Sequence, residues 1–325
     1  MEFGGSYPQN SGPAYTENFR DTYRRCVYIF FASAAESNPE SRLVLFLNRA
    51  WKTESSKVSK EVSEGLDRLG VEVIIIPFTF NVSSSVGLWK NQFFVLDVIR
   101  FAYLNWSTEN LLVILDSDII WNPRVNSDGF WDELLKFGLL TYEIKYGPFE
   151  VVNGLSRQDL TIISEAIEPR NAAILPYLGG EFIALDLVHI EKIFLRIEKD
   201  YALHLSRISA NLPSFTEEAH FLSHIYSVLD HPHHDASRFV KRIWTMFLRF
   251  QNSNQSDKSL LLLHVPAEKN YGIRRLYKMC KGDKKFSDIF EFSTVGIPSN
   301  PIKKIIRDSS WAVLRRFWRK VRFLR

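Results

Sequence analysis

Residues 111–121 read LLVILDSDIIW, and the rest of the chain can be interpreted outward from this stretch. Its first five residues are apolar and predict a strand that is buried on both faces, as in the interior of a parallel sheet. Asp116 and Asp118 follow at the carboxyl end of that strand, and apolar residues return at once with Ile119. A solvated turn would be expected to stay polar. The two carboxylates are therefore candidates for a functional role at the strand end.

Alternating strand and helix patterns surround this stretch. A helix is expected at 16–36, a strand at 42–48, an amphipathic helix at 56–70, a strand at 71–78 and a long helix at 86–106. This alternation predicts a parallel, doubly wound α/β sheet flanked by helices. In such sheets ligands bind beyond the carboxyl ends of the strands, which is where the two aspartates lie.

The second half of the chain is less regular. Its expected elements are a helix at 130–140, a glycine-marked loop running into a strand at 176–186, helices at 187–205 and 214–229, and a short buried strand at 260–265. No repeat or low-complexity linker divides the chain. We expect one domain over 1–300, with a first half of about 1–125 and a second half of about 126–300, followed by a tail at 301–325.

The bulk composition is that of an ordinary globular protein, with 46% apolar and 24% charged residues. Cys26 and Cys280 are the two cysteines, so neither a disulfide framework nor a cysteine metal pair is expected, and a reducing compartment is the simpler interpretation. No apolar run approaches the roughly 18 to 20 residues that a membrane-spanning helix needs. We therefore expect a cytoplasmic protein, either soluble or peripheral on the inner face of a membrane.

The basic charge is concentrated in the tail. Residues 303–325 hold nine Lys or Arg and one acid, so the other 302 residues carry 32 basic and 36 acidic side chains. An acidic body argues against nucleic acid as a partner. Spacings of three and four place Trp311, Leu314, Trp318 and Val321 on one helix face and Arg315, Arg319 and Arg322 on the other. This pattern favours a basic amphipathic helix on an anionic membrane surface, and packing on the domain or on a partner is the alternative.

Two carboxylates one residue apart can both reach a single divalent cation. Hard oxygen ligands suit Mg²⁺ or Mn²⁺, which keep several waters and bridge to substrate phosphates. Chance also supplies such pairs, and a solvated strand-to-loop turn is the alternative for Asp116 and Asp118 taken alone. The later motifs of the chain therefore carry much of the interpretation.

Four further features accompany the aspartate pair. They are Lys90 in the preceding helix, Gly179-Gly180-Glu181 in YLGGEFIALD, Glu218-Ala219-His220 in SFTEEAHFL, and His264 with Lys269 in LLLLHVPAEKNYG. In this order of motifs, over about residues 40 to 275, the chain resembles nucleotide-sugar glycosyltransferases of the GT-A fold. The similarity is to the retaining galactosyltransferases and to glycogenin-like enzymes. It implies a Rossmann-like, doubly wound mixed sheet.

The resemblance implies a metal site and a donor site. Asp116 and Asp118 would hold Mn²⁺ or Mg²⁺ on the diphosphate of the donor, and His264 would be a third ligand. The alternative for His264 is a core histidine whose hydrogen bonds are made to the backbone. Lys269 would contact the diphosphate, although the family's usual Lys-Pro-Trp is replaced by Lys-Asn-Tyr at 269–271. Ser117 would lie against the donor.

The same resemblance assigns the remaining motifs. Gly179 and Gly180 would allow sugar and acceptor to approach closely, with Glu181 touching hydroxyls, and a plain β-turn is the alternative. Lys90 would reach the donor, or it is a surface lysine. Glu218 would face the anomeric carbon or act as the base.

A capping box is expected just before Glu218. Ser214 and Glu217 have the Ser-x-x-Glu spacing of a helix start, which would leave Glu218 as the freer carboxylate. The segment DHPHHD at 230–235 imitates a metal site, but no strand or helix would converge its side chains. We expect it to be an exposed loop.

The resemblance implies a hexosyltransferase that moves a sugar from a nucleotide donor, UDP-sugar favoured, to a glycan or lipid-linked glycan. Envelope polysaccharide or glycolipid synthesis would be its setting. Such domains begin with a strand that packs on the nucleobase, whereas here only residues 1–3 precede a Gly- and Pro-rich segment. We expect that strand to be a stub or missing. The alternatives are an inactive, membrane-associated scaffold of the same fold and a sugar nucleotidyltransferase.

Overall fold

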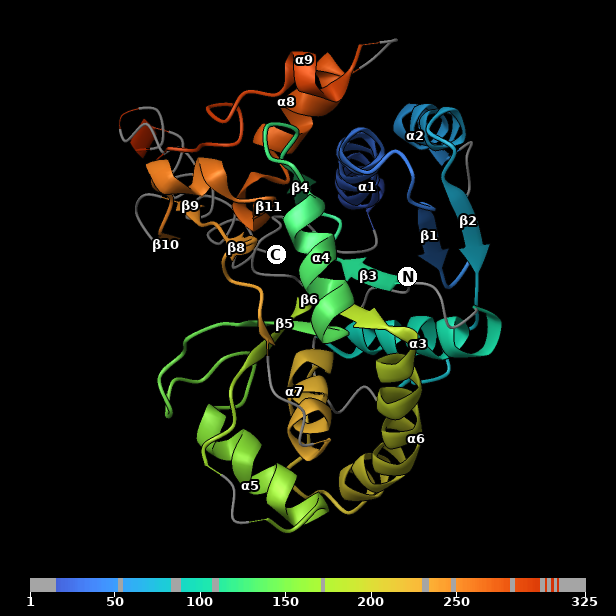
Figure 1. The fold of residues 1–325 in the computed structure, drawn as a ribbon, viewed down its shortest axis with the longest axis vertical. Helices are drawn as coiled ribbons and strands as arrows, with labels where there is room; N and C mark the ends of the chain where they lie inside the picture. Colours follow the sequence, from blue (N-terminus) through green and yellow to red (C-terminus); the bar gives the residue numbers. More distant parts are fainter. Residues whose placement is uncertain are drawn as a thin grey trace, which may run out of the picture.

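The computed structural model describes residues 16–51, 55–82, 89–106, 111–170, 173–229, 234–246, 250–280 and 284–298, together with 302, 305, 306 and 309. These residues form a mixed α/β structure (Figure 1). Four sheets are hydrogen-bonded separately, with strand orders β1-β2, β10-β9, β4-β11-β8 and β3-β6-β5-β7.

The first elements follow the predicted alternation of helix and strand. Helix α1 (Glu17–Ser37) is followed by β1 (Val44–Leu47), α2 (Lys57–Arg68) and β2 (Glu72–Ile75). Both helices begin at side-chain caps, since Thr16 accepts a hydrogen bond from the Phe19 N–H and Ser56 accepts one from the Ser59 N–H. Strands β1 and β2 pair in parallel, as the sequence predicted for them.

The central sheet contains β3 (Leu111–Leu115), β5 (Leu139–Glu143), β6 (Leu178–Asp186) and β7 (His234–Asp235). Strand β6 lies between β3 and β5 and runs antiparallel to both, whereas β5 pairs with β7 in parallel. The sheet is therefore mixed, and the parallel sheet predicted from the alternation of elements is wrong. The long helix expected at 86–106 is a 3₁₀ turn η3 (Lys90–Phe93) that continues as α3 (Phe94–Asn105).

Helices pack against the central sheet on one side. They are α5 (Arg157–Ile167), α6 (Leu187–Ser209) and α7 (Glu218–Val228), which lie together below the sheet in Figure 1. The largest hydrophobic cluster fills this layer and joins Ile183 and Leu185 of β6 to Ile193 of α6 and Phe221 of α7. This packing fixes the start of α7 beside the start of β6, where Gly180 faces Glu218.

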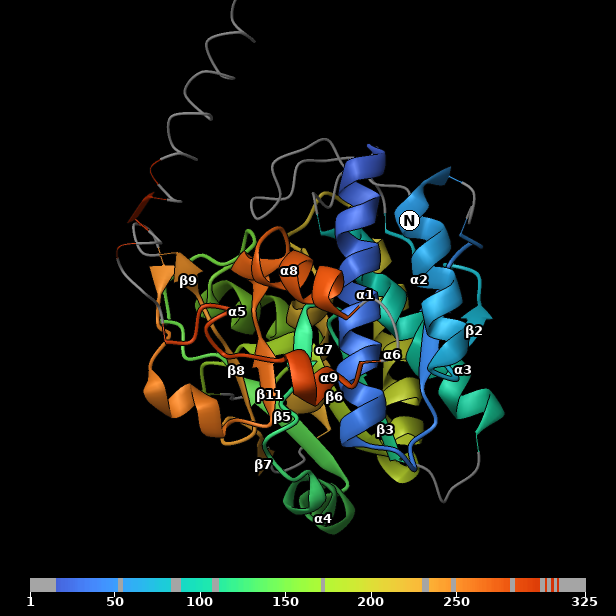
Figure 2. The same cartoon turned by 90° about the horizontal axis from the view of Figure 1, so that it is seen from above.

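A three-stranded sheet explains why the chain turns apolar again after the two aspartates. Strand β4 (Ile119–Trp121) is fully paired with β11 (Leu262–His264), and β11 pairs in turn with β8 (Val240–Arg242). Helix α1, the long helix at the centre of Figure 2, covers β4, and the hydroxyl of Ser33 accepts a hydrogen bond from the Trp121 N–H at 3.1 Å. The apolar return is therefore a second buried strand.

The expectation that β3 is buried on both faces is also wrong. Of its five residues only Leu112 is buried, and the other four keep partial exposure. Strand β3 pairs with β6 on one edge and is not paired with β1 on the other, and both β1 and β3 line the same cavity. The apolar run of β3 therefore forms one wall of that cavity.

The remaining elements complete the chain. They are α4 (Asp128–Phe137), β9 (Thr245–Met246), β10 (Phe250–Gln251), η4 (Gln255–Ser259), η5 (Pro266–Glu268), α8 (Gly272–Met279) and α9 (Phe286–Ile289). Among the described residues, none of the helices has the length and apolarity required to cross a bilayer. The predicted basic helix at 303–325 lies outside the described residues apart from Ile305, Ile306 and Ser309, and so do residues 1–15.

Candidate metal and substrate site

The two aspartates lie in the short turn between β3 and β4 and line a cavity of about 1390 Å³. The turn is closed by a hydrogen bond of 3.1 Å from the Asp116 N–H to the carbonyl of Glu181 and one of 3.0 Å from the Ile119 N–H to the carbonyl of Asp116. The Asp116 side chain is 55% exposed, whereas that of Asp118 is 2% exposed. One carboxylate therefore faces the cavity and the other lies behind it.

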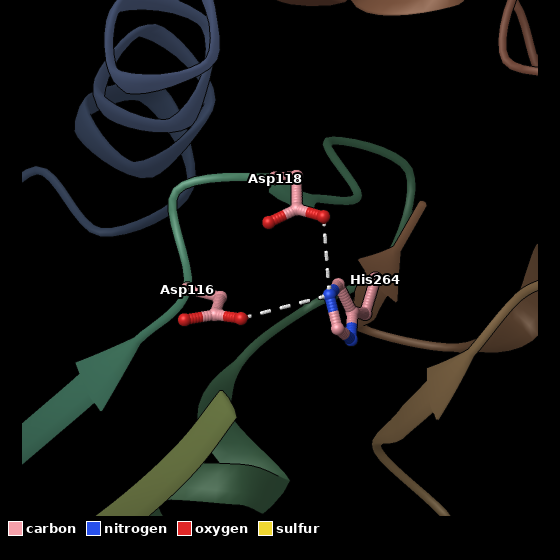
Figure 3. A group of neighbouring side chains, drawn as sticks. All are labelled: Asp116, Asp118 and His264. Atoms are coloured by element: carbon pink, nitrogen blue, oxygen red, sulfur yellow. Dashed lines mark hydrogen bonds and ion pairs between the residues drawn. The ribbon is translucent and has the colours of Figure 1, made fainter. Parts of the chain in front are cut away.

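His264 joins the two aspartates, as the sequence predicted (Figure 3). The register of β11 against β4 places His264 opposite Ile119, directly after the turn. Its Nε2 lies 3.2 Å from Oδ2 of Asp118 and 3.9 Å from Oδ2 of Asp116. One ligand atom from each of the three residues lies within 4.8 Å of the others.

The donor set fits a divalent cation. Two carboxylates and one imidazole nitrogen converge on one point, and one of the carboxylates opens to the cavity. Such a set suits Mn²⁺ or Mg²⁺, which can keep further positions for water or phosphate oxygens. His264 is bonded to carboxylates, so the alternative of a core histidine satisfied by the backbone is wrong.

Lys269 compensates the charge of Asp118. The 3₁₀ turn η5 brings the lysine back after β11, and its Nζ lies 3.1 Å from Oδ2 of Asp118 and 5.0 Å from the centre of the Tyr23 ring. Burial alone would raise the pKa of Asp118, but Lys269 and His264 outweigh it and hold the pKa below its usual range. Burial would lower the pKa of His264, but Asp118 and Glu181 raise it to about 9.

Glu181 is held by Arg242, a residue that no sequence motif singles out. Nε and Nη2 of Arg242 each donate a hydrogen bond of 2.7 Å, one to each carboxylate oxygen of Glu181. Arg242 also donates to the hydroxyl of Tyr146 at 3.2 Å. Although burial opposes ionisation, Arg242 and His264 keep the pKa of Glu181 below its usual range. Both oxygens of this predicted hydroxyl-binding carboxylate are thus already engaged.

Gly179 and Gly180 lie within strand β6, so the expected loop before the strand is wrong, and so is a plain β-turn. A Cβ on Gly179 would lie 2.4 Å from Oε2 of Glu181, and one on Gly180 would lie 2.2 Å from Oε1 of Glu218. The two glycines therefore leave room for two carboxyl groups of the site. The groups that approach these glycines closely are the carboxyl groups of Glu181 and Glu218.

Glu218 is the first residue of α7, and Glu217 is its N-cap without a capping hydrogen bond from its side chain, so the predicted Ser214–Glu217 capping box is wrong. The Glu217 carboxylate instead accepts hydrogen bonds from Tyr177 at 2.6 Å and from Asn153 at 2.5 Å. Oε2 of Glu218 is buried and has no hydrogen-bond partner in the described part of the chain. Glu218 is therefore the freer carboxyl, as predicted.

Glu217 and Glu218 hold their protons more tightly than an ordinary carboxyl group does. Burial raises the pKa of Glu217 to about 7, in spite of its two hydrogen bonds. Burial also raises the pKa of Glu218 well above its usual value, and the charges of Glu217 and Asp116 add to this effect. This is the opposite of the shift at Asp118 and Glu181.

The other predicted residues have varied placements. Ser117 lines the cavity between the two aspartates. Lys90 begins η3, but its side chain is outside what the structure describes. His220 is buried against the Tyr177 ring, with Nδ1 3.0 Å from the Thr216 hydroxyl, and burial lowers its pKa to about 3.

Sequence reasoning did not select Arg242, Tyr177 or Asn153 for the site. Arg242 and Tyr177 carry no local signal, because their partners are 61 and 40 residues away. Asn153 lies in an Asn-Gly dipeptide, which is typical of a turn, and its φ of 50° agrees with that. The dipeptide does not indicate the contact of Asn153 with Glu217.

Among the described residues, one group of side chains could hold a metal ion, namely Asp116, Asp118 and His264. The described part of the histidine-rich segment 230–235 does not contribute to such a group. Residues 230–233 lie outside the described ranges. His234 and Asp235 form β7, which differs from the expected exposed loop, and the His234 ring stacks on Phe137 with 3.6 Å between ring centres.

Solved structures that are similar to this chain include a glycosyltransferase. The apo form of mouse xyloside xylosyltransferase 1 is similar to this chain with 13% sequence identity and a TM-score of 0.45. The likeness covers 76% of this chain and 93% of that one, and it is too weak to assign the fold. The sequence matches no protein-family model and no curated protein.

Proposed function

We propose that this chain is a metal-dependent glycosyltransferase of the hexosyltransferase type. It would move a sugar from a nucleotide donor, UDP-sugar favoured, to a glycan or lipid-linked glycan, in envelope polysaccharide or glycolipid synthesis. The observation that carries this proposal is the convergence of Asp116, Asp118 and His264 beside Lys269, in a cavity that also contains the Glu217–Glu218 pair. The order of these motifs along the chain is that of the GT-A enzymes that it resembles.

The site formed by Asp116, Asp118 and His264 would bind the diphosphate of the donor through its cation. Asp116, Asp118 and His264 would hold Mn²⁺ or Mg²⁺, and the cation would neutralise charge on the leaving diphosphate. Lys269 is 3.1 Å from Asp118 and so lies close enough to add a second positive charge to the same group. Ser117 lines the cavity between the aspartates and is available to the donor.

The Glu217–Glu218 pair of the same cavity would serve the reacting sugar and the acceptor. Transfer breaks the bond from the anomeric carbon to the diphosphate oxygen and forms one to an acceptor oxygen, which loses its proton. Glu218 projects here from the start of α7, with one oxygen free of hydrogen bonds among the described residues. It would either flank the anomeric carbon or accept the acceptor's proton, and its raised pKa makes its ionised form the stronger base.

A membrane location would bring such an enzyme to a lipid-linked acceptor. The spacing of Trp311, Leu314 and Trp318 opposite Arg315 and Arg319 supports a surface-bound helix in the tail. Each basic residue near anionic lipid contributes about 1 kcal/mol, so nine of them within 303–325 are sufficient for peripheral binding.

The test is a screen of nucleotide sugars for binding and hydrolysis with and without Mn²⁺. We expect one donor class to be hydrolysed slowly in the presence of metal, and Asp118→Asn to abolish this hydrolysis. Asp132→Asn is the matched control, because Asp132 is an exposed residue of α4 outside the cavity. If no donor is bound or hydrolysed, or if Asp118→Asn behaves like the control, the glycosyltransferase assignment fails and the inactive scaffold is favoured.

A further inference from the structure

The imidazole of His264 lies between two carboxylates that engage opposite nitrogens. Nε2 faces the aspartates, whereas Nδ1 lies 3.3 Å from Oε1 of Glu181. His264 and Glu181 are both buried. A ring with its two nitrogens engaged in this way cannot rotate without losing both contacts. The orientation of His264 toward the cation position thus depends on Glu181 as well as on Asp118.

Glu181 is itself fixed from several sides. The two hydrogen bonds from Arg242 hold both of its oxygens in a planar fork, which restrains the carboxylate more than a single contact would. Arg242 is restrained in turn by its bond to Tyr146 and by its backbone N–H, which donates to the hydroxyl of Tyr142 at 3.0 Å. Gly179 leaves the space that the carboxylate occupies, since a Cβ there would lie 2.4 Å from Oε2 of Glu181.

The pairing of strands that are distant in the sequence brings these residues together. The parallel register of β8 and β11 places Arg242 opposite His264. Glu181 on β6 accepts the N–H of Asp116 at its carbonyl, which links its strand to the metal turn. Three strands from distant parts of the chain therefore converge on one imidazole.

We propose that Glu181 and Arg242 are positioning residues for the metal ligand His264. Glu181 accepts a hydrogen bond from the Nδ1–H of His264, which leaves Nε2 as the nitrogen that faces the cation. Arg242 holds that carboxylate in place and balances its charge, so that Glu181 does not compete for the cation. A carboxylate behind a metal-binding histidine typically changes metal affinity by roughly 10- to 100-fold. This inference rests on the metal site of the proposed function and assigns Glu181 a role other than binding hydroxyls.

The test is direct titration with Mn²⁺ alone, measured from the electron paramagnetic resonance signal of the free ion. We expect Glu181→Ala to weaken Mn²⁺ binding roughly 10- to 100-fold. In a His264→Ala background the same change should have no further effect, because Glu181 then has no imidazole to orient. Glu181→Met, which keeps the length of the side chain but offers no oxygen to Nδ1 of His264, serves by the same criteria where the alanine variant does not fold.

Asp200→Asn is the matched control. Asp200 is also a buried carboxylate paired with an arginine, Arg196, but it lies on α6 and bonds to His224. It should lower thermal stability and leave Mn²⁺ affinity unchanged. Undiminished Mn²⁺ affinity in the Glu181 variants, an equal loss in the His264→Ala background, or a wild-type chain that does not bind Mn²⁺ would overturn the assignment. A wild-type chain that binds Mn²⁺ but hydrolyses no donor defeats the proposed function alone.

Discussion

Substitution of Gly180 by alanine should disturb the proposed reaction without disturbing the metal site. Gly180 lies within β6 and its φ is not among the positive values, so an alanine backbone fits the strand. Its Cβ, however, would lie 2.2 Å from Oε1 of Glu218, whereas ordinary contacts begin at 3.4 Å. The carboxyl oxygen must therefore move by about 1.2 Å, which is the difference between these two distances.

The size of the effect follows from that displacement. A misplacement of about 1 Å in a reacting group costs on the order of 100-fold in rate. Moving the Glu218 side chain away from its rotamer costs only about 0.5–1.5 kcal/mol, so the fold should persist. We therefore expect Gly180→Ala to lower kcat for sugar transfer about 100-fold, with unchanged Mn²⁺ affinity and a small loss in Tm.

Gly129→Ala is the matched control, because a Cβ at Gly129 in α4 meets no atom within 4 Å. The measurement is steady-state transfer kinetics of both variants, with Mn²⁺ titration and thermal unfolding on the same samples. Wild-type kcat in a folded Gly180→Ala protein would show that the position of Glu218 is not important for the reaction. A loss of Mn²⁺ affinity instead would place Gly180 in the metal site.

Three further predictions concern other parts of the chain. Lys269→Met should raise the donor KM by roughly 10- to 100-fold, which corresponds to the loss of one hydrogen bond to a charged group. It should not weaken Mn²⁺ binding, because the substitution removes a cation that competes for Asp118. Weaker Mn²⁺ binding in this variant would contradict the role assigned to Lys269. His204 is buried among aromatic rings, which lowers its pKa from 6.5 to about 4. Between pH 6.5 and pH 4 the unfolded chain therefore binds a proton at His204 that the folded chain does not bind. Through this group the free energy of unfolding falls by about 2.5 kcal/mol as the pH is lowered from 7.5 to 4.5. Urea unfolding at both pH values should show that loss reduced in His204→Phe, and an identical pH dependence in the two proteins would refute it. Deletion of 303–325 should abolish cosedimentation with phosphatidylserine liposomes and leave donor hydrolysis intact, whereas unchanged binding would rule out the tail as the anchor.

The sequence predicted the local features of this molecule better than the pairing of its strands. Period and capping chemistry placed α1, β1, α2 and β2 within a few residues, because these signals are contained in each segment. The antiparallel position of β6 was missed, since strand order depends on contacts between distant segments. The apolar run of β3 looked like a strand buried on both faces because its sequence does not distinguish a sheet interior from a cavity wall.

The candidate site shows the same division. The resemblance to GT-A enzymes implied that Asp116, Asp118 and His264 share a site, and the structure brings them together. Arg242 was not predicted, because its position opposite His264 comes from the pairing of β8 with β11. The capping role predicted for Glu217 was wrong, and the pairing of Glu181 with Arg242 was missed, for the same reason. Their hydrogen-bond partners lie far away in sequence, where no local pattern reveals them.

The cavity contains similar acids in two opposite electrostatic settings. Lys269, His264 and Arg242 keep Asp118 and Glu181 ionised, whereas burial and the charge of Asp118 raise the pKa of Asp116. The closest partners of Glu217 are neutral, namely Tyr177 and Asn153, and burial then favours the protonated carboxyl. Carboxyl groups whose pKa values are driven apart in this way are suited to different tasks in one reaction. Cationic partners therefore hold the charges of Asp118 and Glu181, whereas Glu217, with a pKa of about 7, is a carboxyl group of this cavity that is able to gain or release a proton near neutral pH.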